Sequence, residues 1–102
     1  MKLLTQELRQ KFPKLYSQEK KDPKDVKIIA KFFCPWNGWT WYATEFDGKD
    51  RFFGYVRGNE NELGYFSLSE LQGIKGQWEL TIERDLYFGE NHTLAEVMAK
   101  DL

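Results

Sequence analysis

The sequence is poor in the residues that build disulfides, metal sites and catalytic triads. Its 102 residues include one cysteine, Cys34, and one histidine, His92. A single cysteine excludes an internal disulfide, and the two residues are too far apart in sequence to match a Cys/His zinc motif. His92 has no evident nucleophile beside it and Cys34 lies among aromatic residues, so we assign neither a catalytic role.

Long apolar runs are also missing. No stretch approaches the length of a membrane-spanning helix, and residues 1–12 carry charges where a signal peptide has an uninterrupted apolar core. We therefore expect no membrane partner and no secretion. A lone cysteine fits a reducing compartment, and the expected location is the cytoplasm.

An excess of one charge is lacking as well, since the formal net charge is −1. Residues 1–25 are net basic and residues 26–102 net acidic. The basic residues of the segment 17–25 alternate with acidic ones, whereas a DNA-binding face needs concentrated positive charge to release counterions. Nucleic acid remains a possible partner but is not favoured.

The residues that are present describe a folded domain. The chain is 41% hydrophobic, 17% aromatic and 30% charged, which is too apolar for a disordered protein. Its length suits one domain with its own core. We expect a single domain over residues 1–102, in which the polar, proline-containing segment 17–25 is an exposed connection.

Helix and strand signals predict an α+β fold. One short helix is expected between the cap Thr5 and Pro13, and two more after the capping-box residues Ser67 and Thr93. Four β-favouring segments cover residues 26–33, 39–46, 51–56 and 78–82. We predict a mainly antiparallel sheet of about four strands, arranged as a meander, with short helices at the N-terminus, between the last strands and at the C-terminus.

Turn residues set the expected strand register. If Asn37 and Gly38 form a two-residue hairpin turn, Cys34 lies opposite Trp41. The second connection is either a two-residue turn at residues 47–48 or a four-residue loop, and the two-residue turn places Gly54 opposite the same tryptophan. A glycine there would let the indole lie over bare backbone.

The run at residues 36–42 contains three of the four tryptophans and is the first candidate binding site, with the members Trp36, Trp39, Trp41 and Tyr42. Such rings can stack on a nucleobase, a sugar or a nucleotide signal, or they can fill a small core. We expect Trp41 and Tyr42 to belong to the core, and Trp36, nearest the turn, to be the most exposed.

Two further candidate binding residues are Tyr65 and Arg84. Tyr65 lies in a short apolar piece, residues 63–66. Arg84 follows a β-like segment and can either bridge carboxylates within the fold or bind a phosphate or carboxylate ligand. No glycine-rich phosphate loop accompanies it, and no cofactor is expected.

Four carboxylates are the candidate catalytic residues if the protein is an enzyme: Glu45, Asp47, Glu83 and Asp85. Carboxylates that converge can bind a divalent metal or divide acid and base roles. Their spacing matches no metal motif, so we predict no metal site and favour turn capping and ion pairing for all four.

Several short motifs recur together between about residues 15 and 88. They are Lys-Phe-Phe at 31–33, Trp-Thr-Trp-Tyr at 39–42, Thr-Glu-Phe-Asp-Gly at 44–48, Phe-Gly at 53–54, Glu-Leu-Gly-Tyr-Phe-Ser-Leu at 62–68, Glu-Leu at 70–71 and Ile-Glu-Arg-Asp at 82–85. In this combination the chain resembles the domain-of-unknown-function family numbered 2958. The turn at residues 34–38 departs from that pattern, so the resemblance does not extend to Trp36.

The resemblance implies a small protein of bacteria, plasmids, integrative elements or phages, often encoded near antirestriction and conjugation functions. It implies no activity and no catalytic residues. The leading hypothesis is a non-enzymatic binding module of a mobile genetic element, for example a counter-defence protein that binds a host defence factor or its nucleotide signal.

Two other functions and a homodimer stay open. One alternative is a metal-assisted hydrolase that uses the carboxylates, and the other is a nucleic-acid-binding accessory protein. The expected partner is a host protein or a nucleotide-type small molecule. An unpaired edge strand, either residues 26–33 or residues 78–82, could also pair with a second copy.

Overall fold

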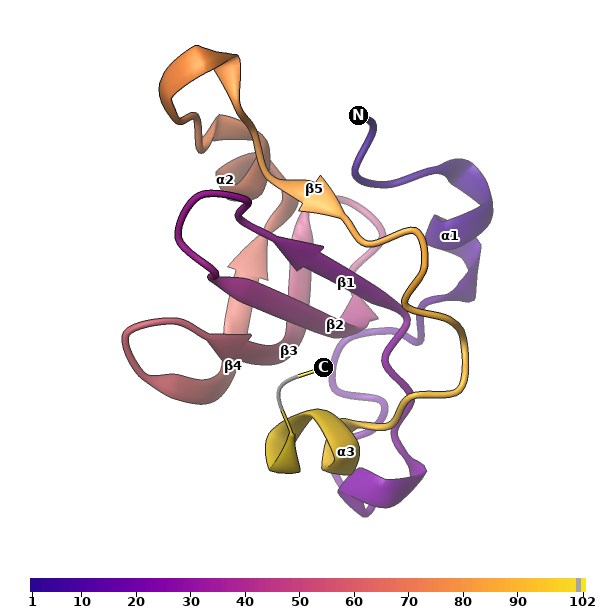
Figure 1. Cartoon of the computed structure of the whole chain (residues 1–102). Coiled ribbons are helices and arrows are strands. Elements are labelled where there is room, and N and C mark those ends of the chain that lie inside the picture. Colours follow the sequence, from indigo (N-terminus) through magenta and orange to yellow (C-terminus); the bar gives the residue numbers. More distant parts are fainter. Residues whose placement is uncertain (101) are drawn as a thin grey trace.

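The computed structural model describes residues 1–100 and residue 102. Its centre is an antiparallel sheet of five strands in the order β4-β3-β2-β1-β5 (Figure 1). The strands are β1 (Ala30–Phe33), β2 (Thr40–Phe46), β3 (Arg51–Arg57), β4 (Asn61–Ser67) and β5 (Glu83–Arg84). The α-helices are α1 (Gln6–Lys11), α2 (Leu68–Gly73) and α3 (Leu94–Ala99), and 3₁₀ turns cover Pro23–Asp25 and Gln77–Glu79. The predicted α+β class is confirmed.

All three α-helices begin at the predicted caps. Each cap hydroxyl accepts a hydrogen bond from the amide three residues later: Thr5 from Leu8 at 3.1 Å, Ser67 from Glu70 at 3.0 Å and Thr93 from Glu96 at 3.3 Å. These bonds satisfy amides that a helix start leaves without partners. Helix positions were therefore readable from local sequence. Within the described residues, no helix has the length and apolarity needed to cross a membrane.

The sheet holds one more long strand than predicted. The sequence predicts only a short apolar piece at residues 63–66, but β4 pairs with β3 over its whole length, from Arg51 opposite Ser67 to Arg57 opposite Asn61. Polar residues and Gly64 give this segment little intrinsic β-propensity. Pairing with β3 therefore stabilises this strand in place of intrinsic β-propensity.

The predicted strand at residues 78–82 is wrong. The chain forms a tight turn there, and the amide of Leu80 donates to the carbonyl of Gln77 at 3.2 Å. Of the apolar residues that alternate in this segment, only Ile82 is buried. The strand β5 begins afterwards, at Glu83, and pairs with β1.

The register between β1 and β2 also differs from the prediction. Phe33 lies opposite Thr40 and Phe32 opposite Trp41, so Cys34 does not face Trp41. The connection is longer than a two-residue turn: the amide of Cys34 donates to the carbonyl of Trp39 at 2.8 Å, and the side chain of Asn37 accepts a hydrogen bond from the amide of Trp39 at 3.0 Å.

Gly54 is a glycine for a different reason from the one expected. It lies opposite Ala43, where the ladder shifts by one residue between Ala43 and Glu45. A Cβ atom on Gly54 would lie 1.8 Å from the carbonyl oxygen of Tyr42. The close approach of the neighbouring backbone, and not an indole, therefore requires glycine here.

Each face of the central strands packs against a core. One core contains buried residues of the N-terminal segment, the strands and α2, among them Leu4, Phe32, Trp41, Phe52 and Leu71. The other core lies beneath α3 and the segment before β1, and its members are Val26, Ile28, Tyr42, Tyr55, Leu94 and Val97. Exposed large apolar side chains therefore lie outside these cores, in the loops, as at Trp36 and Trp78, and on strand β4, as at Leu63 and Tyr65.

Candidate functional site

The candidate binding run at residues 36–42 is divided between interior and surface. Trp41 is 7% exposed and Tyr42 is fully buried, each in a different core. Trp39 is partly buried, whereas Trp36 is 39% exposed. The buried pair offers no surface to a ligand, so contact with another molecule falls to the loop residue Trp36.

Two indoles of this run lie against glycines from other segments. A Cβ on Gly58 would lie 2.5 Å from the ring of Trp39, and a Cβ on Gly76 would lie 3.0 Å from the ring of Trp36. Glycine allows a flat ring to approach the backbone this closely. The contact with Gly76 joins the β1–β2 connection to the loop that carries the fourth tryptophan, Trp78.

The loop around Trp78 is a narrow hairpin. Lys75 and Thr81 form an isolated antiparallel bridge, and the amide of Gly76 donates to the carbonyl of Leu80 at 2.9 Å. At its end, Trp78 has φ 62° and ψ 27°, and Glu79 has φ 60°. Positive φ at both central positions is the geometry of a type I′ turn, for which Asn and Gly are the preferred residues.

Trp78 is thus held in an unfavourable conformation and left in solvent. Its side chain is 89% exposed. The left-handed region costs a residue with a Cβ about 1–2 kcal/mol, and a side chain so exposed returns little of that through packing. Backbone strain of this kind is concentrated at functional sites. We call the exposed apolar residues Trp36, Trp78 and Leu80 the tryptophan surface.

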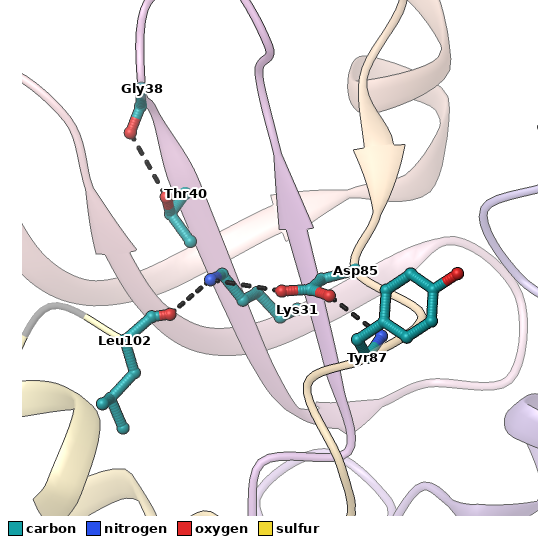
Figure 2. Close-up of polar contacts among 6 residues, drawn as sticks. All are labelled: Lys31, Gly38, Thr40, Asp85, Tyr87 and Leu102. Carbon is teal, nitrogen blue, oxygen red and sulfur yellow. Dashed lines mark hydrogen bonds and ion pairs between the residues drawn. The ribbon is translucent and has the colours of Figure 1, made fainter.

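The candidate carboxylate Asp85 belongs to an ion pair. Its Oδ2 lies 3.4 Å from Nζ of Lys31, and its Oδ1 accepts a hydrogen bond from the amide of Tyr87 at 3.0 Å. Lys31 also donates to the main-chain oxygen of Leu102 (Figure 2). This network ties β1 to the segment after β5, which is a structural role.

Arg84 likewise binds a group of its own chain. Its Nη1 donates to the carbonyl oxygen of Leu3 at 3.1 Å and so attaches the N-terminal segment to β5. Its neighbour Glu83 pairs with Phe33 at the edge of the sheet.

A groove of about 430 Å³ lies between α1, the segment before β1 and residues 84–91. Its charged lining residues are Glu7, Lys11, Lys27, Lys31, Arg84, Asp85 and Glu90. Lys11 and Glu90 pair at 2.8 Å, which raises the pKa of Lys11 and lowers the pKa of Glu90. Four basic and three acidic side chains line the groove, and three of the basic ones, Lys11, Lys31 and Arg84, already bind groups of the chain itself.

The carboxylates of Glu45 and Asp47 both accept hydrogen bonds from main-chain amides. Glu45 is 4% exposed, and its two oxygens accept hydrogen bonds from the amides of Tyr16 at 2.8 Å and Gln18 at 3.0 Å. Asp47 Oδ1 accepts hydrogen bonds from the main-chain amides of residues 49–51. Desolvation raises the pKa of Asp47, but these three donors outweigh it and lower the pKa overall. Across residues 1–100 and 102, no group of three or more His, Cys, Asp or Glu side chains could hold a metal ion.

Tyr65 lies on the outer strand β4 and is half exposed. Its ring meets Phe53 edge-on with centroids 5.1 Å apart, and Tyr16 with centroids 6.2 Å apart. The guanidinium of Arg51 lies 5.7 Å from the ring centroid. Leu63 follows the same alternation along β4 and is also exposed. We call Leu63 and Tyr65 the edge surface.

The model of the DUF2958 family, described as a protein of unknown function, matches residues 3–100 of the chain. The chain belongs to this family. A search of curated proteins and a search of solved structures each found no match. For this DUF2958 protein, the functional argument therefore comes from its own residues.

Sequence reasoning missed two residues of the tryptophan surface. Trp78 and Leu80 were assigned to a strand because apolar and polar residues alternate there, and a short hairpin loop produces the same alternation. Gly76 could have distinguished a hairpin loop from a strand, because glycines at positions 73 and 76, shortly before Trp78, indicate a turn. None of the motifs that carry the DUF2958 resemblance includes Trp78.

Proposed function

We propose that this protein is a non-enzymatic binding module and that the tryptophan surface inserts into an apolar pocket of a protein partner. The observation that carries the proposal is Trp78, which is 89% exposed and held at positive φ. Tryptophan is enriched among the interface residues that dominate binding energy, because it buries a large area and retains one polar group.

The loop geometry supports a preorganised anchor. The bridge between Lys75 and Thr81 and the hydrogen bonds of Gly76 and Leu80 fix the loop on both sides of Trp78. A side chain presented from a fixed turn loses less conformational freedom on binding than one on a flexible loop. The hydrogen-bonded loop therefore favours association of Trp78 with another molecule.

The surroundings of Trp78 favour a protein over a nucleic acid. Its near neighbours Lys75, Gln77 and Glu79 are exposed and together carry one positive and one negative charge. An apolar centre with a mixed polar rim is typical of protein interfaces. A surface that binds nucleic acid would instead carry several positive charges to neutralise phosphates.

The biological setting we propose is a mobile genetic element, where the protein would act in counter-defence by occupying a host defence factor. Support for this setting comes from the kinds of element that the family resemblance implies. Support for the contact itself comes from the tryptophan surface, so the two parts can be tested separately.

The test compares Trp78→Ala with Tyr87→Ala. Both side chains are almost fully exposed in turns, but Tyr87 lies outside the tryptophan surface. Each variant and the wild type are immobilised, exposed to a bacterial host lysate and analysed by quantitative mass spectrometry. The dissociation constant of the recovered partner is then measured by calorimetry with purified proteins.

We expect a partner that binds the wild type and Tyr87→Ala equally, and that binds Trp78→Ala at least about 10-fold more weakly, as a hot-spot residue would. The melting temperatures of the three proteins should agree, which shows that binding and not folding has changed. A partner whose affinity is the same for Trp78→Ala and for wild type would overturn the proposal. Recovery of a bound nucleotide in place of a protein by native mass spectrometry would also overturn it.

A further inference from the structure

The two edges of the sheet are protected to different degrees. At one edge, β5 has two residues, and the main chain after it continues with a hydrogen bond from the Asp85 amide to the Lys31 carbonyl at 2.9 Å. At the other edge, β4 has seven residues and, among the residues that the structure describes, pairs only with β3 (Figure 1). The edges expected from sequence, residues 26–33 and 78–82, are wrong, because β1 lies between β2 and β5 and residues 78–82 form no strand.

Strand β4 lacks the usual defences of an exposed edge. Its pairing with β3 keeps one register throughout, without a bulge. It contains no proline and no lysine, and its single charged residue is Glu62. Soluble proteins commonly interrupt such an edge with charge, proline or a bulge, since its free amides and carbonyls can pair with another strand.

We propose that β4 pairs with β4 of a second copy of this chain, antiparallel, about a two-fold axis at Gly64. In this register Leu63 lies opposite Tyr65 of the partner subunit, and the same contact forms again across the axis. Leu63 is 44% and Tyr65 is 50% exposed in the single chain. Directly opposed apolar and aromatic side chains stabilise strand pairing.

Self-complementarity selects a second copy over an unrelated strand. The two-fold register places Asn61 opposite Ser67 of the partner subunit, so polar residues face each other at both ends. Glu62 lies opposite Phe66 of the partner subunit, and the two Glu62 carboxylates are therefore not opposed. One strand thus supplies both halves of each contact.

Gly64 provides an independent observation. A Cβ atom there would meet no heavy atom within 4 Å, and its φ is not in the left-handed region. The fold of a single chain therefore does not require glycine at this position, in contrast to Gly54. Glycine within a strand often marks the close approach of another backbone. The proposed axis brings a second backbone to Gly64.

The experiment is sedimentation equilibrium of the full chain over a wide concentration range, together with hydrogen exchange of the β4 amides. We expect a reversible dimer, and slower exchange at residues 61–67 as the protein concentration rises. Leu63→Lys should raise the dimer dissociation constant at least about 10-fold, because it removes two symmetric contacts and adds an edge charge. Leu86→Lys changes an exposed leucine away from β4 and should leave that constant unchanged.

Three results would overturn the proposal. They are a monomer at every concentration, a dimer with the same dissociation constant in Leu63→Lys, and hydrogen exchange at residues 61–67 that does not depend on concentration. The hydrogen-exchange measurement uses the wild type, so it tests the pairing of β4 with a second copy even if a variant folds poorly. The tryptophan surface plays no part in this contact, and either proposal can fail alone.

Discussion

The four tryptophans form two pairs with opposite environments. Trp39 and Trp41 pack together with ring centroids 5.9 Å apart, and Trp41 belongs to a core. Trp36 and Trp78 lie in loops and remain exposed. Residue type is the same in both pairs, so position in the fold decides the role: Trp41 lies in β2 and Trp39 directly before it, whereas Trp36 and Trp78 lie in turns that leave their rings in solvent.

Backbone conformation sharpens the contrast between Trp41 and Trp78. Trp41 lies within an extended strand, which suits a large aromatic residue. Trp78 lies in the left-handed region, which does not suit one. Trp41 therefore stabilises the folded state, whereas the backbone conformation of Trp78 destabilises it. Folding alone explains a tryptophan at position 41 but not at position 78.

The largest expected effect comes from alanine at these two positions. Trp41→Ala should lower the free energy of unfolding by about 3–5 kcal/mol, because it empties part of a packed core. Trp78→Ala should change it by less than about 0.5 kcal/mol, as is usual for exposed sites. Urea unfolding followed by circular dichroism measures both values. Similar losses in the two variants would erase the distinction between the pairs.

The same division between interior and surface applies to the carboxylates. Glu45→Ala should lower the free energy of unfolding by about 1–3 kcal/mol, since it leaves the amides of Tyr16 and Gln18 without their acceptor. Glu62→Ala, on the exposed strand β4, serves as the matched control and should change stability by less than about 0.5 kcal/mol. Thermal and urea unfolding both report the difference. If Glu45→Ala is as stable as Glu62→Ala, Glu45 does not anchor residues 16–18.

Local signals account for the parts of the fold that the sequence predicts correctly. The caps Thr5, Ser67 and Thr93 act within one helical turn, and the β1-β2-β3 meander follows from β-favouring runs separated by turn residues. Strand β4 could not be read in this way, because its polar residues become a strand only through pairing with β3. The register at β1–β2 differs from the prediction because the chain closes between Cys34 and Trp39, with residues 35–38 between them, in place of a two-residue turn at Asn37 and Gly38.

The candidate site was only partly predictable for the same reason. Aromatic content pointed to residues 36–42, and the expected division within this run is confirmed: Trp36 is exposed, and Trp41 and Tyr42 are buried. Trp78 was not predicted as an exposed residue because the alternation of apolar and polar residues in its hairpin loop is also typical of a strand. Positive φ at Trp78 is a property of the folded backbone, and a sequence without Gly or Asn at that position gives no sign of it.

The smallest expected effect tests the strain itself. Trp78→Gly and Glu79→Gly should each raise the free energy of unfolding by about 0.5–1 kcal/mol, because glycine adopts positive φ without a steric cost. Gln77→Gly is the control, since Gln77 has no positive φ, and it should lower stability through the greater freedom of the unfolded chain. Thermal unfolding of the three variants against wild type measures these changes.

The two glycine variants also separate the effect of backbone strain on stability from the effect of the indole on partner binding. Glu79→Gly relieves the turn but keeps Trp78, so it should bind the partner as wild type does, whereas Trp78→Gly should be more stable and lose binding. A residue whose removal improves the fold and abolishes association is retained for association. If Trp78→Gly instead destabilises the domain as much as Gln77→Gly does, the turn is not strained, and the strongest reason for treating Trp78 as a binding residue disappears.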